Sequence, residues 1–252
     1  MEDIDLYKPA RMRSLVEQAA VAKSKNDAAR LFVLALLAGA FIAFGGAFYL
    51  VVLSNADPIT GLVRAAGGGA CSLGLVLVIV GGAELFTGNA LMVMACVDRL
   101  ISVPALLRNW GIVFVGNFLG ALLIVGLFWM AGSFDGSSGE TARAVAEAKF
   151  SLTSGQAFAR GILCNALVCL AVWLSFAART AAGKTLVVVF PVAAFVTLGL
   201  EHSIANMFLL PIGMLAGADG GIGAFVGNLI PVTLGNILGG AGGVAIAYWF
   251  AF

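Results

Sequence analysis

Long apolar runs separated by short polar connections dominate this chain. A helix needs about 20 mostly apolar residues to cross a bilayer. Runs of this kind lie at 31–53, 69–97, 109–131, 157–178, 185–215 and 224–252. The pattern therefore predicts an all-α membrane protein with six transmembrane segments.

Composition supports the membrane assignment. The chain has 252 residues, of which 61% are hydrophobic and 11% charged, with a mean hydropathy of +1.05. A soluble domain of this length needs more polar surface, so an ordinary cytosolic enzyme is excluded. Fourteen Lys and Arg residues against 13 Asp and Glu residues leave no basic excess for phosphates, so no nucleic acid is expected as a partner.

The polar N-terminal region is distinct from the rest. Residues 1–30 carry charges throughout and have no apolar core with a cleavage site, so they do not resemble a secretory signal. We expect them to form a partly amphipathic N-terminal helix, followed by a six-span membrane domain over 31–252. Ten Lys and Arg residues fall on the side of the termini and four on the other, which predicts cytoplasmic termini.

Two of the apolar runs contain a matching polar interruption. Glu84-Leu-Phe-Thr-Gly-Asn89 lies in the second run and Glu201-His-Ser-Ile-Ala-Asn206 in the fifth, and both predict a broken helix. About 30 residues later follow Gly116-Asn-Phe-Leu-Gly-Ala121 and Gly235-Asn-Ile-Leu-Gly-Gly240. Matched landmarks in the same order indicate duplication. Each copy holds three spans, so the repeats, approximately 31–131 and 157–252, are inverted, an architecture that builds its site near the midplane.

Three ionisable residues are expected at that midplane. Glu84 and Glu201 are the acidic residues deep inside apolar runs, and His202 is the single histidine. A charge at the bilayer centre costs at least about 2.5 kcal/mol, so such groups pair or line a cavity. The symmetric glutamates are interpreted as structural acceptors for backbone amides freed at the breaks. His202 has no counterpart in the first repeat, where Leu85 takes its place, which favours a functional role.

Several further polar residues lie near the breaks or in the helices beside them. Thr87 and Asn165 are candidates to bond an imidazole or a small solute, although both residue types also serve as interhelical contacts. Asn89 and Asn206 recur as a pair and are expected to be scaffold. The four cysteines form no C-x-x-C pair or Cys/His cluster, so no metal and no cofactor is predicted. One histidine without a nucleophile and base at compatible positions argues against an enzyme.

Four strings carry a family resemblance. Ala83-Glu-Leu-Phe-Thr-Gly88, Gly161-Ile-Leu-Cys-Asn165 with the residues up to Trp173, Glu201-His-Ser-Ile-Ala-Asn-Met207 and Gly227-Asn-Leu-Ile-Pro-Val-Thr-Leu-Gly-Asn236 closely resemble the formate/nitrite transporter family. The resemblance covers essentially the whole membrane domain. It implies an aquaporin-like fold, a homopentamer with one pore per protomer, and passage of small monovalent anions through the cytoplasmic (inner) membrane of a bacterium.

The resemblance also implies roles for individual residues. His202 matches the central pore histidine, Thr87 the threonine of the broken second helix, and Asn165 a polar position near that histidine. The implied pore constriction comprises Leu75, Leu85, Phe86, Phe195 and Cys71. Cys71 departs from formate-type relatives, which commonly place Phe there, and its smaller side chain is expected to widen the constriction or alter selectivity. Lys23 and Lys149 resemble vestibule lysines that attract anions.

These features predict a channel or channel-like transporter for weak-acid anions, with formate favoured and nitrite or hydrosulfide as alternatives. A bare anion loses its hydration shell in a dry constriction, whereas its neutral conjugate acid crosses at lower cost. A midplane histidine that gives the anion a proton would supply that form, so protons are an expected co-substrate. A pore for water, glycerol or ammonia is the alternative of another class. The paired Asn-Pro-Ala boxes of aquaporins are missing, and an ammonia channel would present two histidines.

Overall fold

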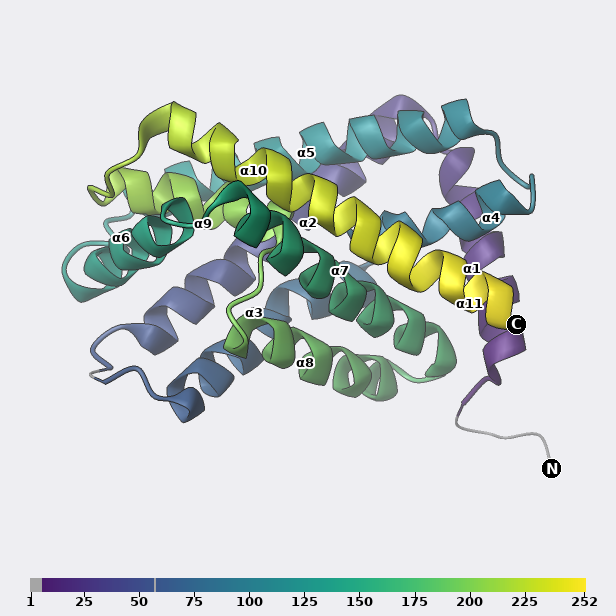
Figure 1. The fold of residues 1–252 in the computed structure, drawn as a ribbon, viewed down its shortest axis with the longest axis horizontal. Helices are drawn as coiled ribbons and strands as arrows, with labels where there is room; N and C mark the ends of the chain where they lie inside the picture. Colours follow the sequence, from purple (N-terminus) through teal and green to yellow (C-terminus); the bar gives the residue numbers. More distant parts are fainter. Residues whose placement is uncertain (1–5, 57) are drawn as a thin grey trace.

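The computed structural model describes residues 6–56 and 58–252, and helices make up almost all of this part of the chain (Figure 1). In chain order the elements are α1 Pro9–Ser24, α2 Ala28–Leu53, α3 Gly61–Gly81, the 3-10 helix η1 Gly88–Met92, α4 Val93–Val97, α5 Val103–Met130, α6 Ser137–Phe150, α7 Ser154–Ala177, α8 Ala181–Thr197, α9 Ser203–Leu215, α10 Gly221–Ile237, the π-helix η2 Leu238–Ile246 and α11 Ala247–Ala251.

Polar caps fix where the long helices begin. The side chains of Asp27, Thr60, Ser102 and Thr180 each accept a hydrogen bond from a backbone N–H in the first turn of α2, α3, α5 and α8. Thr153 forms a capping box at the start of α7. Such caps satisfy amides that have no partner inside the helix, which explains why several helices begin before the apolar runs do.

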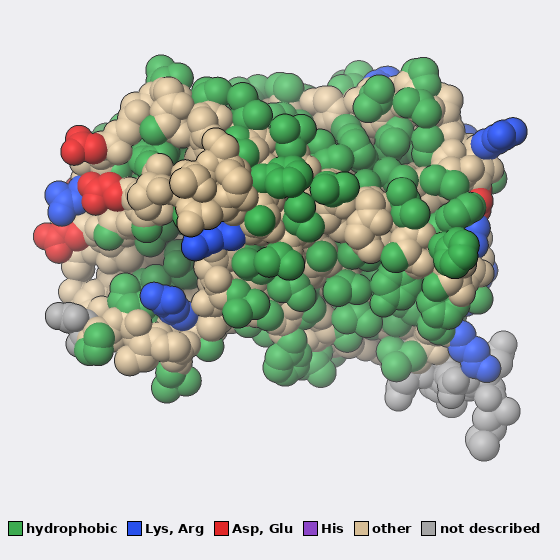
Figure 2. Space-filling model, in the orientation of Figure 1, with side chains coloured by type: hydrophobic (Ala, Val, Ile, Leu, Met, Phe, Trp, Pro, Cys, Tyr) green, Lys and Arg blue, Asp and Glu red, His purple; other side chains and the backbone are tan. Residues whose placement is uncertain are grey.

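Within the described residues, five helical segments are long and apolar enough to cross a membrane: α2, α3, α5, α7, and α10 continued through η2 and α11. The fifth apolar run of the sequence is instead divided between α8 and α9, which are shorter apolar helices. Figure 2 shows a broad band of hydrophobic side chains between two ends where the charged side chains gather. This distribution fits a protein surrounded by lipid at its middle.

Both polar interruptions coincide with breaks between helices. α3 ends at Gly81, and Gly82 follows with a φ of 77° before the chain restarts at η1. α8 ends at Thr197, and Gly199 follows with a φ of 66° before α9 begins. Glycine adopts this left-handed conformation without a steric penalty, so it terminates each helix and turns the chain.

Small residues allow two helix pairs to cross closely. A Cβ on Gly120 of α5 would lie 2.9 Å from the backbone carbon of Leu36 in α2. A Cβ on Gly239 of η2 would lie 2.8 Å from the backbone carbon of Ile162 in α7. Neither position has room for a side chain. The glycines therefore let the backbones touch, as is common between membrane helices.

The N-terminal helix α1 packs onto one end of the molecule, near α4, α11 and the chain's C-terminus (Figure 1). Met12, Val16 and Ala20 bury its apolar face. The Arg13 guanidinium donates to an Asp98 carboxylate oxygen at 2.6 Å, and the Trp249 indole N–H donates to the other at 2.7 Å. Residues 1–5 of the predicted N-terminal helix lie outside the described residues.

The connection between the third and fourth predicted spans contains a helix that the hydropathy pattern does not show. This helix, α6, packs against α9, and Ala142 and Ala146 lie against Gly213. A Cβ on Gly213 would lie 2.6 Å from the carbonyl oxygen of Ala142. The packing matters for the site because Lys149 lies in the last turn of α6.

Candidate functional site

Three cavities follow one another through the protein. One cavity of about 540 Å³ opens between the end of α2, the start of α3, α6 and the break before α9. Another of about 270 Å³ lies between α1, α3, the break before η1, α7 and the start of α8. A third of about 20 Å³ shares residues with both of the others. We call them the α6 cavity, the α1 cavity and the central cavity.

The central cavity is connected to its neighbours by apolar side chains. Cys71 and Phe195 line both the central and the α6 cavity, whereas Leu75 and Leu85 line both the central and the α1 cavity. Leu75, Leu85 and Phe195 are buried. A cavity of this size has room for about one water molecule. The path between the two wide cavities is thus narrow and apolar on both sides of its midpoint.

His202 is the polar group of this narrow segment. It lines both the central and the α6 cavity and is 4% exposed. Its Nε2 lies 2.9 Å from the Thr87 hydroxyl, so the two predicted residues meet although they come from the two different breaks. Its ring lies 5.9 Å from that of Phe195, centroid to centroid.

The second ring nitrogen of His202 has a structural role. Nδ1 accepts a hydrogen bond of 3.1 Å from the Ala205 backbone N–H, so His202 is the N-cap of α9. An accepting Nδ1 carries no proton, and the neutral ring then carries its proton on Nε2. In this tautomer Nε2–H donates to the Thr87 hydroxyl oxygen. The hydroxyl proton of Thr87 is then not used in its contact with His202.

Asn165 does not contact His202 directly. Its amide donates to the Thr87 carbonyl at 3.3 Å and to the Asn236 carbonyl at 2.6 Å, while its own oxygen is buried without a partner in the described chain. The Cys169 thiol also donates to the Thr87 carbonyl. Asn165 therefore holds the break that carries Thr87 against α7 and α10.

A buried polar chain flanks each break. Lys23 donates to Glu84 at 3.1 Å and to Asn89 at 2.7 Å, and Asn89 donates to Glu84 at 2.7 Å and to Asn109 at 2.9 Å. All but Lys23, which is partly exposed, are at most 5% exposed. The ammonium neutralises the carboxylate, which lowers the cost of placing both inside the protein.

The same order recurs at the other break. Lys149 donates to Glu201 at 2.8 Å, and Asn206 donates to Glu201 at 2.7 Å and to Asn228 at 2.8 Å. The prediction that the glutamates accept freed backbone amides is wrong, because among the described residues their carboxylates bond to Lys and Asn side chains. Lys23 and Lys149 do line the wide cavities, but each is paired.

Two other asparagines each accept a hydrogen bond from one freed backbone amide. Asn117 Oδ1 accepts from the Phe86 N–H at 2.9 Å, and Asn236 Oδ1 accepts from the Ser203 N–H at 2.8 Å. Their amide groups donate to backbone carbonyls, including those of Glu84 and Glu201, at 2.9 Å each. Each side chain thereby bridges a break to the following helix.

Sequence reasoning missed the roles of Asn109 and Asn228. The signal that could have identified them is a spacing, because each precedes the bridging asparagine of its half by eight residues.

Phe86 was predicted to line the pore constriction, but the structure places it outside the constriction. Its ring packs edge-on against Trp110 at 5.9 Å and Phe114 at 5.0 Å, and it is not among the residues that line the three cavities.

Comparison with known proteins decides the family. Residues 10–250 match the model of the formate/nitrite transporter family. The chain belongs to the formate/nitrite transporter family. The formate channel FocA of Escherichia coli strain K12 is 38% identical over 98% of this chain and 95% of its own length.

Two solved structures share the fold of this family member. A chain described as an FNT family ion channel superimposes with a TM-score of 0.89 at 28% identity, covering 96% of this chain and 99% of its own. A pentameric formate channel with formate bound gives a TM-score of 0.78 at 38% identity, covering 89% and 97%. These similarities match the resemblance seen in the sequence.

Proposed function

We propose that this protein is a channel for small monovalent weak-acid anions and that formate is its substrate. The observation that carries the proposal is the contact of 2.9 Å between Thr87 and His202 at the narrow midpoint between two wide cavities. The relative that is a formate channel and the similar structure with formate bound support this choice of substrate.

The apolar walls explain why a polar pair is needed at the midpoint. An anion that enters the central cavity leaves its water behind because the cavity has room for about one water molecule. The apolar side chains that line it offer no hydrogen bond of comparable strength in return. His202 lines this cavity, and its Nε2–H, which donates to the Thr87 hydroxyl, can also donate toward such an anion. We infer that this pair substitutes for lost hydration in the constriction.

We further propose that passage is coupled to protons through His202. The anion accepts a proton from Nε2 of the imidazolium, and formic acid and a neutral imidazole result. Because the resting ring carries its proton on Nε2, formation of the imidazolium places the second proton on Nδ1, which then faces the Ala205 N–H as a second donor. Transfer from Nε2 leaves the ring protonated on Nδ1 alone. The relay therefore includes transient loss of the hydrogen bond that caps α9.

The proposed architecture has six crossings in two inverted repeats, approximately 31–131 and 157–252, in an aquaporin-like arrangement. Two crossings are broken ones, α3 with η1 and α4, and α8 with α9. The repeated polar chains and the repeated bridging asparagines support this reading. Residues 1–30 form the N-terminal unit, with both termini cytoplasmic.

We propose a homopentamer in the cytoplasmic (inner) membrane of a bacterium, with lipid around its outer face. The similar pentameric structure and the apolar band in Figure 2 support this assembly and setting.

The test is anion uptake by proteoliposomes with an imposed proton gradient. Wild-type protein should take up formate faster at acidic external pH, and His202→Phe should lose the acid stimulation while remaining an assembled oligomer in detergent. Formate, nitrite and hydrosulfide are compared side by side. Unchanged acid-stimulated uptake by His202→Phe would refute the relay, and transport of water or ammonia without any of the three anions would replace the channel assignment.

A further inference from the structure

One basic side chain that lines the α6 cavity takes no part in the hydrogen bonds and ion pairs that hold the described part of the fold and the two breaks together. Three basic side chains line this cavity: Arg64, Lys149 and Arg160. Lys149 is paired with Glu201, and the Arg160 guanidinium donates to the Gly199 carbonyl. Arg64 has no hydrogen bond or ion pair with any residue that the structure describes.

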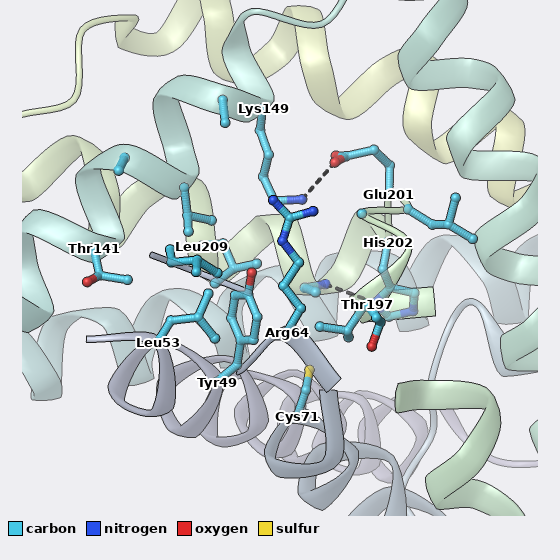
Figure 3. Close-up of a pocket in the computed structure, with 18 of the residues that line it drawn as sticks. Tyr49, Leu53, Arg64, Cys71, Thr141, Lys149, Thr197, Glu201, His202 and Leu209 are labelled. Carbon is cyan, nitrogen blue, oxygen red and sulfur yellow. Dashed lines mark hydrogen bonds and ion pairs between the residues drawn. The ribbon is translucent and has the colours of Figure 1, made fainter. Parts of the chain in front are cut away.

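Figure 3 shows where Arg64 points. Its side chain extends from the start of α3 across the cavity toward Lys149, and the Tyr49 hydroxyl points toward the same space. Tyr49 likewise has no hydrogen-bond partner among the described residues. The guanidinium, the hydroxyl and the ammonium protons not used by Glu201 thus face one space as donors.

The position of Arg64 is unfavourable for the helix that carries it. Thr60 caps α3, so Arg64 lies in the first turn, where the partial positive charge of the helix N-terminus repels a cation. The start of α8 is built in the same way, since Thr180 is its cap and Lys184 follows four residues later. Lys184 lines the α1 cavity and has no partner in the described chain. Each wide cavity therefore receives one unpaired cation from the first turn of a broken helix.

We propose that Arg64 and Lys184 are the receiving sites for anions at the two mouths, and that Arg64 makes the α6 mouth selective for planar oxyanions such as carboxylates. A guanidinium presents parallel N–H groups that match two oxygens of one anion, whereas an ammonium is a point charge. The α6 mouth thus distinguishes formate from a hydrosulfide or halide ion, and the α1 mouth recruits anions by charge alone. This inference rests on the proposed function.

The experiment measures the concentration dependence of formate and hydrosulfide uptake in proteoliposomes of uniform orientation. Arg64→Lys keeps the charge and removes the fork, and Arg64→Gln removes both. Arg143→Gln is the matched control, because Arg143 lies in α6 between Thr141 and Ala144, which line the cavity, but is itself paired with Glu147 and does not line it.

For anions offered at the α6 mouth, Arg64→Lys should raise the KM of formate about fivefold, which is the effect expected at the upper end of the range for an exposed ion pair. The KM of hydrosulfide should stay within about twofold of the wild-type value. Arg64→Gln should raise both, and Arg143→Gln neither. Lys184→Gln should raise both KM values only for anions offered at the α1 mouth.

Equal KM values for Arg64→Lys and wild type toward formate would overturn the selectivity, and unchanged KM values in Arg64→Gln would overturn the site. Both results require a wild-type protein that transports. If wild type carries neither anion, the proposed function itself fails.

Discussion

Replacing Asn236 with leucine tests whether one side chain holds the second break together. Asn236 is fully buried and makes three hydrogen bonds, from the Ser203 N–H at 2.8 Å and to the carbonyls of Gly161 at 2.8 Å and Glu201 at 2.9 Å. Leucine has a similar size but leaves these three backbone groups without partners. Each unsatisfied buried group costs about 1–3 kcal/mol, so the expected loss is about 3–9 kcal/mol.

That loss is a large share of a typical total stability of about 5–15 kcal/mol. We expect Asn236→Leu to unfold in detergent at a much lower temperature than wild type and to lose channel activity. The control is Thr233→Val on the same helix, because the Thr233 hydroxyl is buried without a partner in the described chain. Removing that hydroxyl should leave the melting temperature unchanged or raise it. Equal melting temperatures for Asn236→Leu and Thr233→Val would refute the bridging role.

Three further predictions concern packing, the constriction and the N-terminal helix. Gly120→Val should lower stability by about 1–3 kcal/mol through overpacking against α2, whereas Gly126→Val, with no atom within 4 Å of its Cβ, should not. Cys71→Phe should narrow the constriction and reduce formate uptake without altering assembly, and equal uptake by this variant would contradict the assigned position of Cys71. The hydrogen bond from Trp249, aided by neighbouring side chains, holds the pKa of Asp98 below its ordinary value. The stability this carboxylate adds is therefore fully present above about pH 4 and lost as the pH falls through the lowered pKa, and Asp98→Asn should abolish this dependence in melting curves recorded against pH.

Hydropathy predicted the long helices because lipid imposes their length and apolarity. The starts of α3 and α8 were missed, since capping by Thr60 and Thr180 extends both helices beyond the apolar runs. Hydropathy does not reveal α6 either, because this helix is polar on average. Its place in the fold depends on the close contact of Ala142 and Ala146 with Gly213 of α9.

The candidate site, like the fold, was predictable from the sequence only in part. The meeting of Thr87 and His202 agrees with the expectation that the two breaks converge, and that expectation came from repeated motifs. The partners of Glu84 and Glu201 did not follow from spacing along one helix, because Lys23 and Lys149 lie more than 50 residues away in the chain. Pairing across such separations depends on packing, which one sequence does not display.

The small central cavity also has an electrical consequence. Wide cavities open to water stay close to the potential of the adjoining solution, so the membrane voltage falls mainly across the segment with room for about one water. Moving one charge through the full field changes its energy by about 2.3 kcal/mol per 100 mV. A formate ion crossing between Leu75 and Phe195 would feel most of that field, whereas formic acid would feel none. The voltage dependence of the flux therefore reports which of the two species makes the crossing.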